Sequence, residues 1–107
     1  MQPLGDALDE LMSLTQSERR TIRIIAEYYA ERGYRCFTYR GLQAHYTRNK
    51  HYNSIHWHTV ERSIRRLAES NLLHRHYRGR RNVLFCISRR LMEIVEALGW
   101  ARRRGSQ

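Results

Sequence analysis

The sequence predicts a mainly helical α+β domain with one small antiparallel β-hairpin and a helix at each end of the chain. Two observations lead to this fold class. Apolar residues recur at helical spacing over most of the 107 residues. One segment, 72–88, instead resembles two short strands around a glycine-containing turn. The length suits a single domain, and no repeat or low-complexity linker divides it.

The N-terminal part predicts two helices. Leu4, Leu8 and Leu11 recur at the spacing of a short first helix within residues 1–14. Thr15 and Glu18 have the spacing of a capping box, in which each side chain binds the backbone amide of the other residue. A second helix therefore begins here. It ends at a glycine, residue 33, and turns Ile22, Ile25, Tyr28 and Tyr29 inward.

The middle of the chain predicts a short extended stretch and two further helices. Residues 34–37 are extended, and Thr38 caps a helix over 39–46 whose Leu42 faces the core. A polar connection, 47–53, leads to a longer helix capped by Asn53 or Ser54. Asn71 can adopt the left-handed conformation that ends such a helix.

The C-terminal part predicts the hairpin and the last helix. Strands over 72–78 and 83–88 flank a turn at 79–82. Ser88 then caps a helix over 89–98, and residues 101–107 form a basic tail that we expect to be disordered.

The charge of the chain is strongly positive and unevenly placed. The formal net charge is +10, whereas residues 34–90 alone carry thirteen Lys or Arg against two Glu, a net charge of +11. Lys50 is the only lysine, and the planar guanidinium of arginine suits phosphates and guanine edges. A localised cationic region of this kind predicts a polyanionic partner.

The sequence shows no apolar run of membrane-spanning length and no N-terminal secretion signal. We therefore expect no membrane partner and an intracellular protein, either cytoplasmic or associated with the nucleoid.

Residues 58–81 combine an amphipathic helix with a cationic turn. One face of the helix is apolar, through Val60, Ile64, Leu67 and Ala68. The opposite face collects His58, Arg62, Arg65, Arg66 and Glu69. An arginine-rich helix beside a basic hairpin suits a DNA groove and its phosphates better than a small substrate, so the sequence predicts binding to double-stranded DNA. The alternative for Arg65, Arg66 and Glu69 is a solvated face with local ion pairs.

Three pieces of residues 15–88 resemble the winged helix-turn-helix superfamily, in the broad style of small archaeal and bacterial regulators such as the MarR and PadR families. The first is the helix pattern of Thr59, Val60, Arg62, Ile64 and Leu67. The second is the run 71–73, and the third is the run 79–88, which is similar to the wing and its returning strand. The chain departs from the family in the longer connection before the helix and in Asn71, where the family commonly has glycine.

The resemblance implies a DNA-binding domain over 15–88 and roles for its residues. The recognition helix would place Ile55, His58, Thr59 and Arg62 at base edges. Further along the helix, Arg65 and Arg66 would reach bases or phosphates. The wing would consist of Arg78, Gly79, Arg80, Arg81 and Asn82, and would contact the backbone or the minor groove. Phosphates beside the helix would be held by Tyr39, Arg40, Arg48 and Lys50. Trp57, one turn before Val60, fits the core better than a wedge between bases.

The histidines and cysteines raise two further questions. His74 and His76 would share one face of a strand and could hold a metal ion, but no Cys or His spacing of a common zinc site accompanies them, so we expect no metal. Cys36 and Cys86 would be cross-strand neighbours on the outer face of the sheet. A disulfide between them is possible, but two unbonded thiols are the default expectation for an intracellular protein.

The terminal helices, 1–14 and 89–100, predict a homodimer. Their apolar stripes would form its interface, with Leu4, Leu8, Leu11, Leu91, Ile94, Val95 and Leu98 as contacts. The alternative is that both helices pack on their own domain.

These features together predict a DNA-binding transcriptional regulator that recognises an inverted repeat as a homodimer. We expect no enzyme and no cofactor, because the basic region has few carboxylates, no glycine-rich phosphate loop and no nucleophile–base pattern. One alternative is an architectural, plasmid-partition or replication protein that coats DNA. The other is an RNA-binding or protein-binding module of the same fold.

Overall fold

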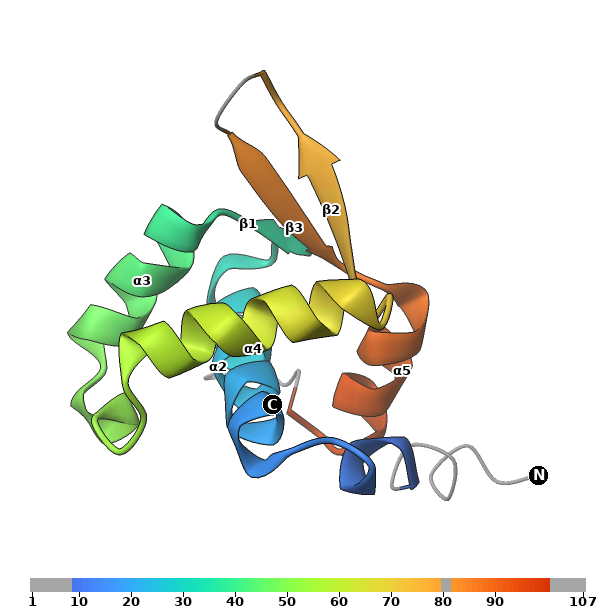
Figure 1. Ribbon diagram of the computed structural model, residues 1–107. Coiled ribbons are helices and arrows are strands. Elements are labelled where there is room, and N and C mark those ends of the chain that lie inside the picture. Colours follow the sequence, from blue (N-terminus) through green and yellow to red (C-terminus); the bar gives the residue numbers. More distant parts are fainter. Residues whose placement is uncertain (1–8, 80–81, 101–107) are drawn as a thin grey trace.

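The computed structural model describes residues 9–79 and 82–100 (Figure 1). These residues form a mixed α+β domain that is mostly helical and has one small antiparallel sheet, as predicted. After a helical turn at 9–12, the elements are α2 (Gln16–Arg32), β1 (Cys36–Phe37), α3 (Tyr39–Arg48), the 3₁₀ helix η1 (Lys50–Tyr52), α4 (Trp57–Glu69), β2 (Leu73–Tyr77), β3 (Val83–Ile87) and α5 (Arg89–Ala97).

Short-range capping fixes the start of three helices, each at the predicted residue. The Thr15 hydroxyl accepts from the Glu18 amide at 3.1 Å, and the Thr15 amide donates to the Glu18 carboxylate at 2.7 Å. Thr38 caps α3 by accepting from the amide of Gly41 at 3.0 Å. Ser88 caps α5 in the same way. Each cap satisfies an amide that the first turn of a helix leaves without a carbonyl partner.

The start of α4 differs from the prediction. Neither Asn53 nor Ser54 caps it: the capping position is His56, whose side chain makes no capping hydrogen bond. The predicted polar connection instead contains η1, so α4 begins only at Trp57. The other end agrees with the sequence, because Asn71 has a φ of 65° and the Leu72 amide donates to the Leu67 carbonyl at 2.9 Å.

The sheet has the strand order β1-β3-β2, and both pairs are antiparallel. The hairpin of β2 and β3 extends away from the helices (Figure 1). On one face, Phe37, Phe85, Ile87 and Leu73 are buried. On the other face, Cys36 lies opposite Cys86, and the two are joined by a disulfide. The predicted cross-strand position of the two cysteines is thus confirmed, and the default expectation of two unbonded thiols is wrong.

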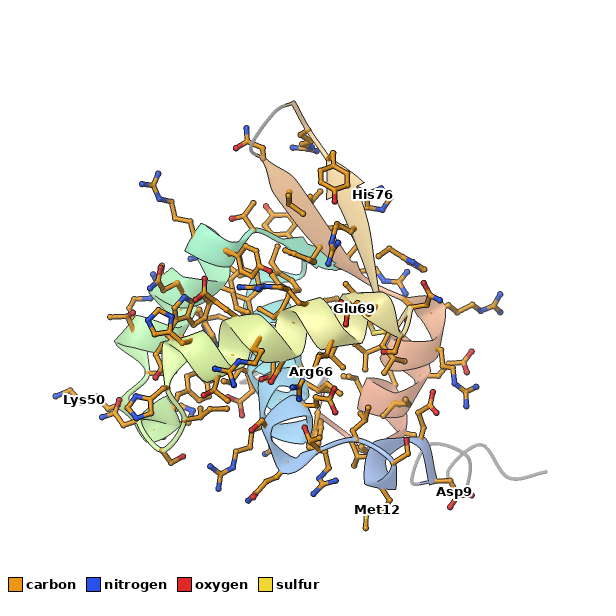
Figure 2. All side chains as sticks on the ribbon, in the orientation of Figure 1. Asp9, Met12, Lys50, Arg66, Glu69 and His76 are labelled. Carbon is orange, nitrogen blue, oxygen red and sulfur yellow. A yellow bond between two sulfur atoms is a disulfide. The ribbon has the colours of Figure 1, made fainter. Side chains whose placement is uncertain are left out.

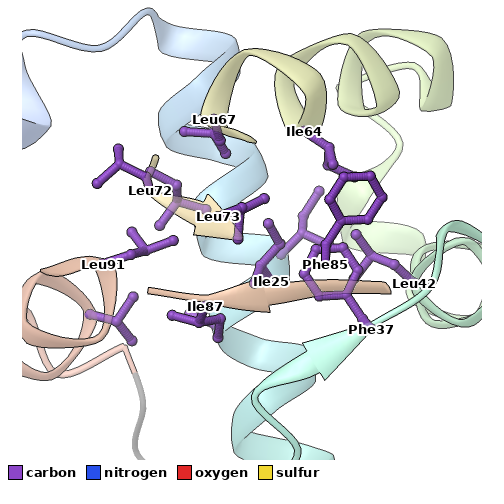
Figure 3. Packing of buried hydrophobic residues seen from close by; sticks show 14 of the residues in the cluster. Ile25, Phe37, Leu42, Ile64, Leu67, Leu72, Leu73, Phe85, Ile87 and Leu91 are labelled. Atoms are coloured by element: carbon purple, nitrogen blue, oxygen red, sulfur yellow. The ribbon is translucent and has the colours of Figure 1, made fainter. Parts of the chain in front are cut away.

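The core lies between α2, α4, α5 and the inner face of the sheet (Figure 3). Ile22 and Ile25 of α2 are buried as predicted, and α4 contributes Val60, Ile64 and Leu67. Among the helices, α4 packs mainly on α2. The inner side of α4 is therefore committed to the core, and its opposite side is left to solvent.

The structure corrects the prediction that the apolar residues of the terminal helices form a dimer interface. Leu91 and Val95 are fully buried within the chain's own core, Ile94 is 2% exposed, and Leu98 packs against the same cluster. Leu11 is buried there too, while Leu4 and Leu8 lie outside the described residues. The described side chains of the stripe close the domain itself, which is the alternative interpretation, so Leu11, Leu91, Ile94 and Val95 are not available as an interface between two folded copies.

Within the described ranges, no helix combines the length and the apolar character needed to cross a lipid bilayer.

Candidate nucleic-acid interface

The outer face of α4 carries three arginines, Arg62, Arg65 and Arg66, together with His58 and Glu69. All five side chains are exposed, and Figure 2 labels Arg66 and Glu69 among them. Their spacing of three and four residues places them on one side of the helix, opposite the buried Val60, Ile64 and Leu67. The sequence prediction of an arginine-rich outer face therefore agrees with the burial of the helix.

These arginines form no ion pairs with the other residues that the structure describes. Among the described residues, the guanidinium groups of Arg62, Arg65 and Arg66 take part in no ion pair, and the pair on this face joins His58 to Glu61 at 3.2 Å. Arginines elsewhere do pair, as Arg89 does with Glu93 and Arg90 with Glu10. The alternative for Arg65, Arg66 and Glu69 is a solvated face with local ion pairs: the three side chains are exposed, but no ion pair joins them in the part of the chain that the structure describes.

The hairpin follows α4 directly, because only residues 70–72 separate α4 from β2. Its turn is closed by the Arg78 amide, which donates to the Asn82 carbonyl at 2.7 Å, and Gly79 has a φ of 78° that favours glycine. The side chains of Arg78 and Asn82 are exposed. Arg80 and Arg81, which the sequence also assigns to this turn, lie outside the described residues.

Two exposed residues of β2 extend this surface and were not singled out from the sequence. Arg75 lies with its guanidinium 5.9 Å from the centre of the Phe85 ring, and Tyr77 is 68% exposed. Arg75 and Tyr77 alternate with the exposed His74 and His76 along the strand. The period of two could have indicated that Arg75 and Tyr77 share a face, but not that this face extends beyond the core.

The other predicted phosphate contacts lie on α3 and η1. Arg40, Arg48 and Lys50 are exposed, and Lys50 lies at the η1 end of the molecule (Figure 2). Tyr39 is half-buried, with its ring 4.8 Å from that of Phe85. Its ring therefore belongs to the edge of the core.

Two residues near the start of α4 need separate mention. Ile55, predicted to contact bases, is 7% exposed and precedes the helix, so it is a core residue. Trp57 packs on the core with its ring 5.5 Å from that of Tyr46, in agreement with the core interpretation. Thr59 is half-buried, which leaves His58 and Arg62 as the exposed predicted residues of the first turns.

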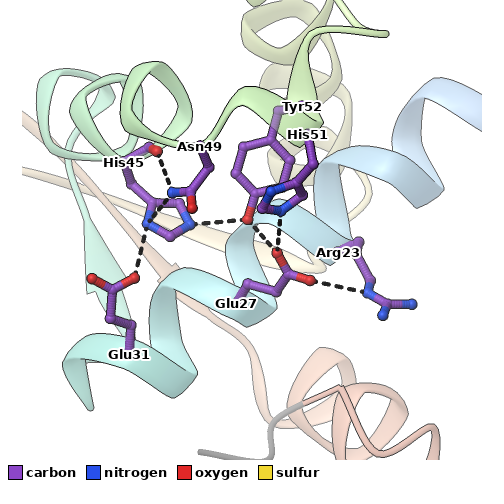
Figure 4. Close-up of polar contacts among 7 residues, drawn as sticks. All are labelled: Arg23, Glu27, Glu31, His45, Asn49, His51 and Tyr52. Carbon is purple, nitrogen blue, oxygen red and sulfur yellow. Dashed lines mark hydrogen bonds and ion pairs between the residues drawn. The ribbon is translucent and has the colours of Figure 1, made fainter. Parts of the chain in front are cut away.

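A polar cluster built around the buried His45 and Tyr52 lies where α2, α3 and η1 meet (Figure 4). His45 is 2% exposed, and its Nε2 lies 3.0 Å from the Tyr52 hydroxyl, which in turn donates to Glu27. His45 Nδ1 lies 3.3 Å from a Glu31 carboxylate oxygen. A hollow of about 200 Å³ adjoins the cluster and is lined also by Arg23, His51 and Trp100. Sequence reasoning missed this cluster.

The surroundings shift two pKa values in this cluster. Burial lowers the pKa of His45 below its ordinary value of 6.5; Arg48 and Arg32 act in the same direction, and Glu31 and Glu27 oppose them. Burial raises the pKa of Glu27, but hydrogen bonds from Tyr52, His51 and Arg23 outweigh it and hold the pKa below 4.5. The structure therefore favours a neutral His45 beside an ionised Glu27.

His74 and His76 are the pair that the sequence offers as possible metal ligands. Within the part of the chain that the structure describes, no three His, Cys, Asp or Glu side chains are grouped as ligands of a metal ion. His74 and His76 are exposed on β2.

Fold and surface together describe a small α+β domain with cations on one helix face, on a hairpin and around a helix–3₁₀ corner. Comparisons of the chain with models of protein families, with curated proteins and with solved structures gave no match. Its function must therefore be inferred from the chemistry of these surfaces.

Proposed function

We propose that the chain is a winged helix-turn-helix protein that binds double-stranded DNA, with α4 as the recognition helix and the β2–β3 hairpin as the wing. The observation that carries the proposal is the row of exposed guanidinium groups of Arg62, Arg65 and Arg66 on the outer face of α4, which form no ion pair within residues 9–79 and 82–100. Cations without protein partners attract phosphates and release the counterions condensed on DNA.

The order of elements supports the proposal. A helix, a short strand, two further helices and a hairpin follow one another, and the short strand pairs with the second strand of the hairpin. This is the arrangement that the family resemblance implies. The 13 residues of α4 span about 20 Å, and a helix of this length fits the major groove.

The arrangement of the cations also favours duplex over a small anion. The exposed arginines lie along a helix and on a protruding hairpin, whereas a small ligand would be bound in a concave pocket. Transcriptional regulation is the function that we propose for such binding. The expectation of an inverted repeat loses much of its structural basis, because four of the described residues assigned to the dimer interface, Leu11, Leu91, Ile94 and Val95, are buried within one copy.

The test is the affinity for duplex DNA measured over a series of salt concentrations. We expect log K to fall linearly with log salt for the wild type, and with a smaller slope for Arg65→Ala and Arg66→Ala. Arg89→Ala is the matched control, because Arg89 is exposed but pairs with Glu93 on α5. It should leave both affinity and slope unchanged. Equal effects at positions 66 and 89 would assign the binding to overall charge and would reject this surface.

A footprint on a long duplex separates the kinds of DNA binding. One short protected site supports a regulator, and protection that spreads with concentration supports a DNA-coating protein. No protection of duplex, with retained binding to RNA, would overturn the proposal.

A further inference from the structure

The polar cluster around His45 and Tyr52 connects three elements through a series of hydrogen bonds. Glu27 of α2 accepts from the Tyr52 hydroxyl of η1, and this hydroxyl also contacts Nε2 of His45 on α3 (Figure 4). His45 and Tyr52 are 2% and 6% exposed. Asn49 closes the corner between α3 and η1, because its side-chain amide donates to the His45 carbonyl at 2.7 Å. These hydrogen bonds thus hold η1 against α2.

From Tyr52 the contacts continue to the start of α4. The Tyr52 and Tyr46 rings are stacked, with an interplanar angle of 7°, and the Tyr46 hydroxyl donates to the Ile55 carbonyl. The Tyr46 ring also packs on Trp57, the first residue of α4. Because no side chain caps α4, these tertiary contacts position its first turn.

The direction of each hydrogen bond between Glu27, Tyr52 and His45 follows from the number of hydrogens that each side chain carries. The single hydrogen of the Tyr52 hydroxyl goes to Glu27, so the hydroxyl oxygen must accept from His45 Nε2. A neutral imidazole has only one N–H, which leaves Nδ1 as an acceptor. Nδ1 lies 3.5 Å from the side-chain amide of Asn49 and 3.3 Å from the carboxylate of Glu31. In neutral His45, Nδ1 therefore accepts from the side-chain amide of Asn49. A second proton on the ring would make Nδ1 a donor to the Glu31 carboxylate.

We propose that His45 is a proton switch for the corner formed by residues 49–56: neutral His45 keeps η1 on α2, and proton uptake opens the corner and releases the first turn of α4. The switch itself is independent of any ligand. Its consequence for DNA recognition rests on the proposed function of α4.

The reason for opening is the cost of a cation in this position. The charged and titratable groups around His45 are Glu27, Tyr28, Glu31 and Arg32 of α2, Arg48 of α3, and His51 and Tyr52 of η1. Glu31, the carboxylate in direct contact, is 54% exposed, and Arg32 and Arg48 oppose a further positive charge. A buried imidazolium loses its hydration, and an ion pair with a carboxylate as exposed as Glu31 compensates for only part of this cost. The protonated ring is therefore more stable in water, which it reaches when the corner opens.

Amide hydrogen exchange without nucleic acid tests the switch. The amides of Tyr52, Asn53 and Ile55 bond to carbonyls within the corner. In the wild type, their protection factors should fall several-fold between about pH 7.5 and about pH 5.5, whereas those of α2 should change little. In His45→Gln, which takes up no proton, protection of the corner should not depend on pH. The same fall in both proteins would overturn the switch.

Two surface substitutions keep the test decisive if His45→Gln does not fold. Glu31→Gln removes the carboxylate that favours the protonated form, so the acid-induced loss of protection should become larger. Arg32→Gln removes an opposing charge, so the loss should become smaller. Opposite changes support the switch. Equal changes would assign the effect to general loosening and would overturn it.

Duplex binding at the two pH values then tests the consequence. The wild type should lose preference between duplex sequences at about pH 5.5, and His45→Gln should retain it. Absence of duplex binding at neutral pH rejects the proposed function, while hydrogen exchange still decides the switch. A retained preference in an opened corner would overturn the link to α4.

Discussion

Cys36 of β1 and Cys86 of β3 lie opposite each other in the sheet, with their Cα atoms 3.9 Å apart and their sulfur atoms bonded. The two cysteines are separated by 50 positions in the sequence, and the segment between them contains α3, η1, α4 and β2. The disulfide therefore closes a loop that includes the whole candidate interface. Closing a loop of this length in the unfolded chain stabilises the folded state by up to about 4 kcal/mol.

We expect the double variant Cys36→Ser with Cys86→Ser to lower the free energy of unfolding by about 2–4 kcal/mol. The measurement is denaturant unfolding with and without a thiol reductant. Reductant should destabilise the wild type by a similar amount and leave the double variant unchanged. A wild type that is indifferent to reductant would contradict a stabilising role for this disulfide.

Val95→Asp should unfold the domain rather than separate two copies. Val95 is fully buried among the residues of its own core, and a carboxylate there has no partner, so the substitution should destabilise by more than about 4 kcal/mol. Ala97→Asp is the matched control, since Ala97 is exposed on the same helix and should lose at most about 1 kcal/mol. Circular dichroism and thermal unfolding distinguish the two. A folded Val95→Asp monomer would restore the dimer interpretation of the stripe.

Thr21→Val should stabilise the fold. Thr21 is fully buried in α2, and its hydroxyl has no hydrogen-bond partner among the described residues. Valine keeps the shape and removes the unsatisfied group, which is worth roughly 1 kcal/mol. Thermal unfolding should show a higher midpoint than the wild type. Thr21→Ser, which retains the hydroxyl but loses a methyl group, should be less stable than both.

The parts of this fold that the sequence predicts depend on neighbours a few positions apart. Thr15, Thr38 and Ser88 cap helices through amides three residues away, so the residue pattern alone indicates them. The facing positions of the two cysteines were predictable as well, because period-two alternation places both side chains on the outer face of the sheet, whereas their bond was not.

What the sequence does not predict depends on distant partners. The apolar stripe of Leu91 and Val95 looks the same whether its own core or a second copy covers it. His45 shares the inner side of α3 with Leu42, but Glu27 and Tyr52 come from two other segments. The start of α4 is likewise set by tertiary contacts from Tyr46, and no local cap marks it.

Stability should fall in acid, and Glu27 should account for part of the loss. Its folded pKa is below the ordinary value of 4.5, so the unfolded chain takes up a proton first as the pH falls. The stabilisation is therefore present above about pH 4.5 and is lost as the pH falls through the folded pKa. In Glu27→Gln, the free energy of unfolding should depend less on pH in this range. An unchanged pH profile would contradict an ionised, hydrogen-bonded Glu27.

The exposed arginines of the proposed interface should divide their work between sequence preference and overall affinity. Arg62 lies in the N-terminal half of α4, near the end of a recognition helix that reaches base edges, whereas Arg78 lies at the turn of the hairpin. Arg62→Ala should thus reduce the difference in affinity between a preferred and a random duplex, by about 1–3 kcal/mol. Arg78→Ala should weaken binding to both duplexes alike and reduce the slope of log K against log salt by about one.

Both Arg62 and Arg78 are exposed, so neither substitution should alter the fold, which thermal unfolding checks. Fluorescence titrations of each variant with the two duplexes at several salt concentrations measure the affinity for each duplex and its dependence on salt. If the two variants lose the same affinity for both duplexes, α4 binds phosphates as the hairpin does, and its role in reading sequence is wrong.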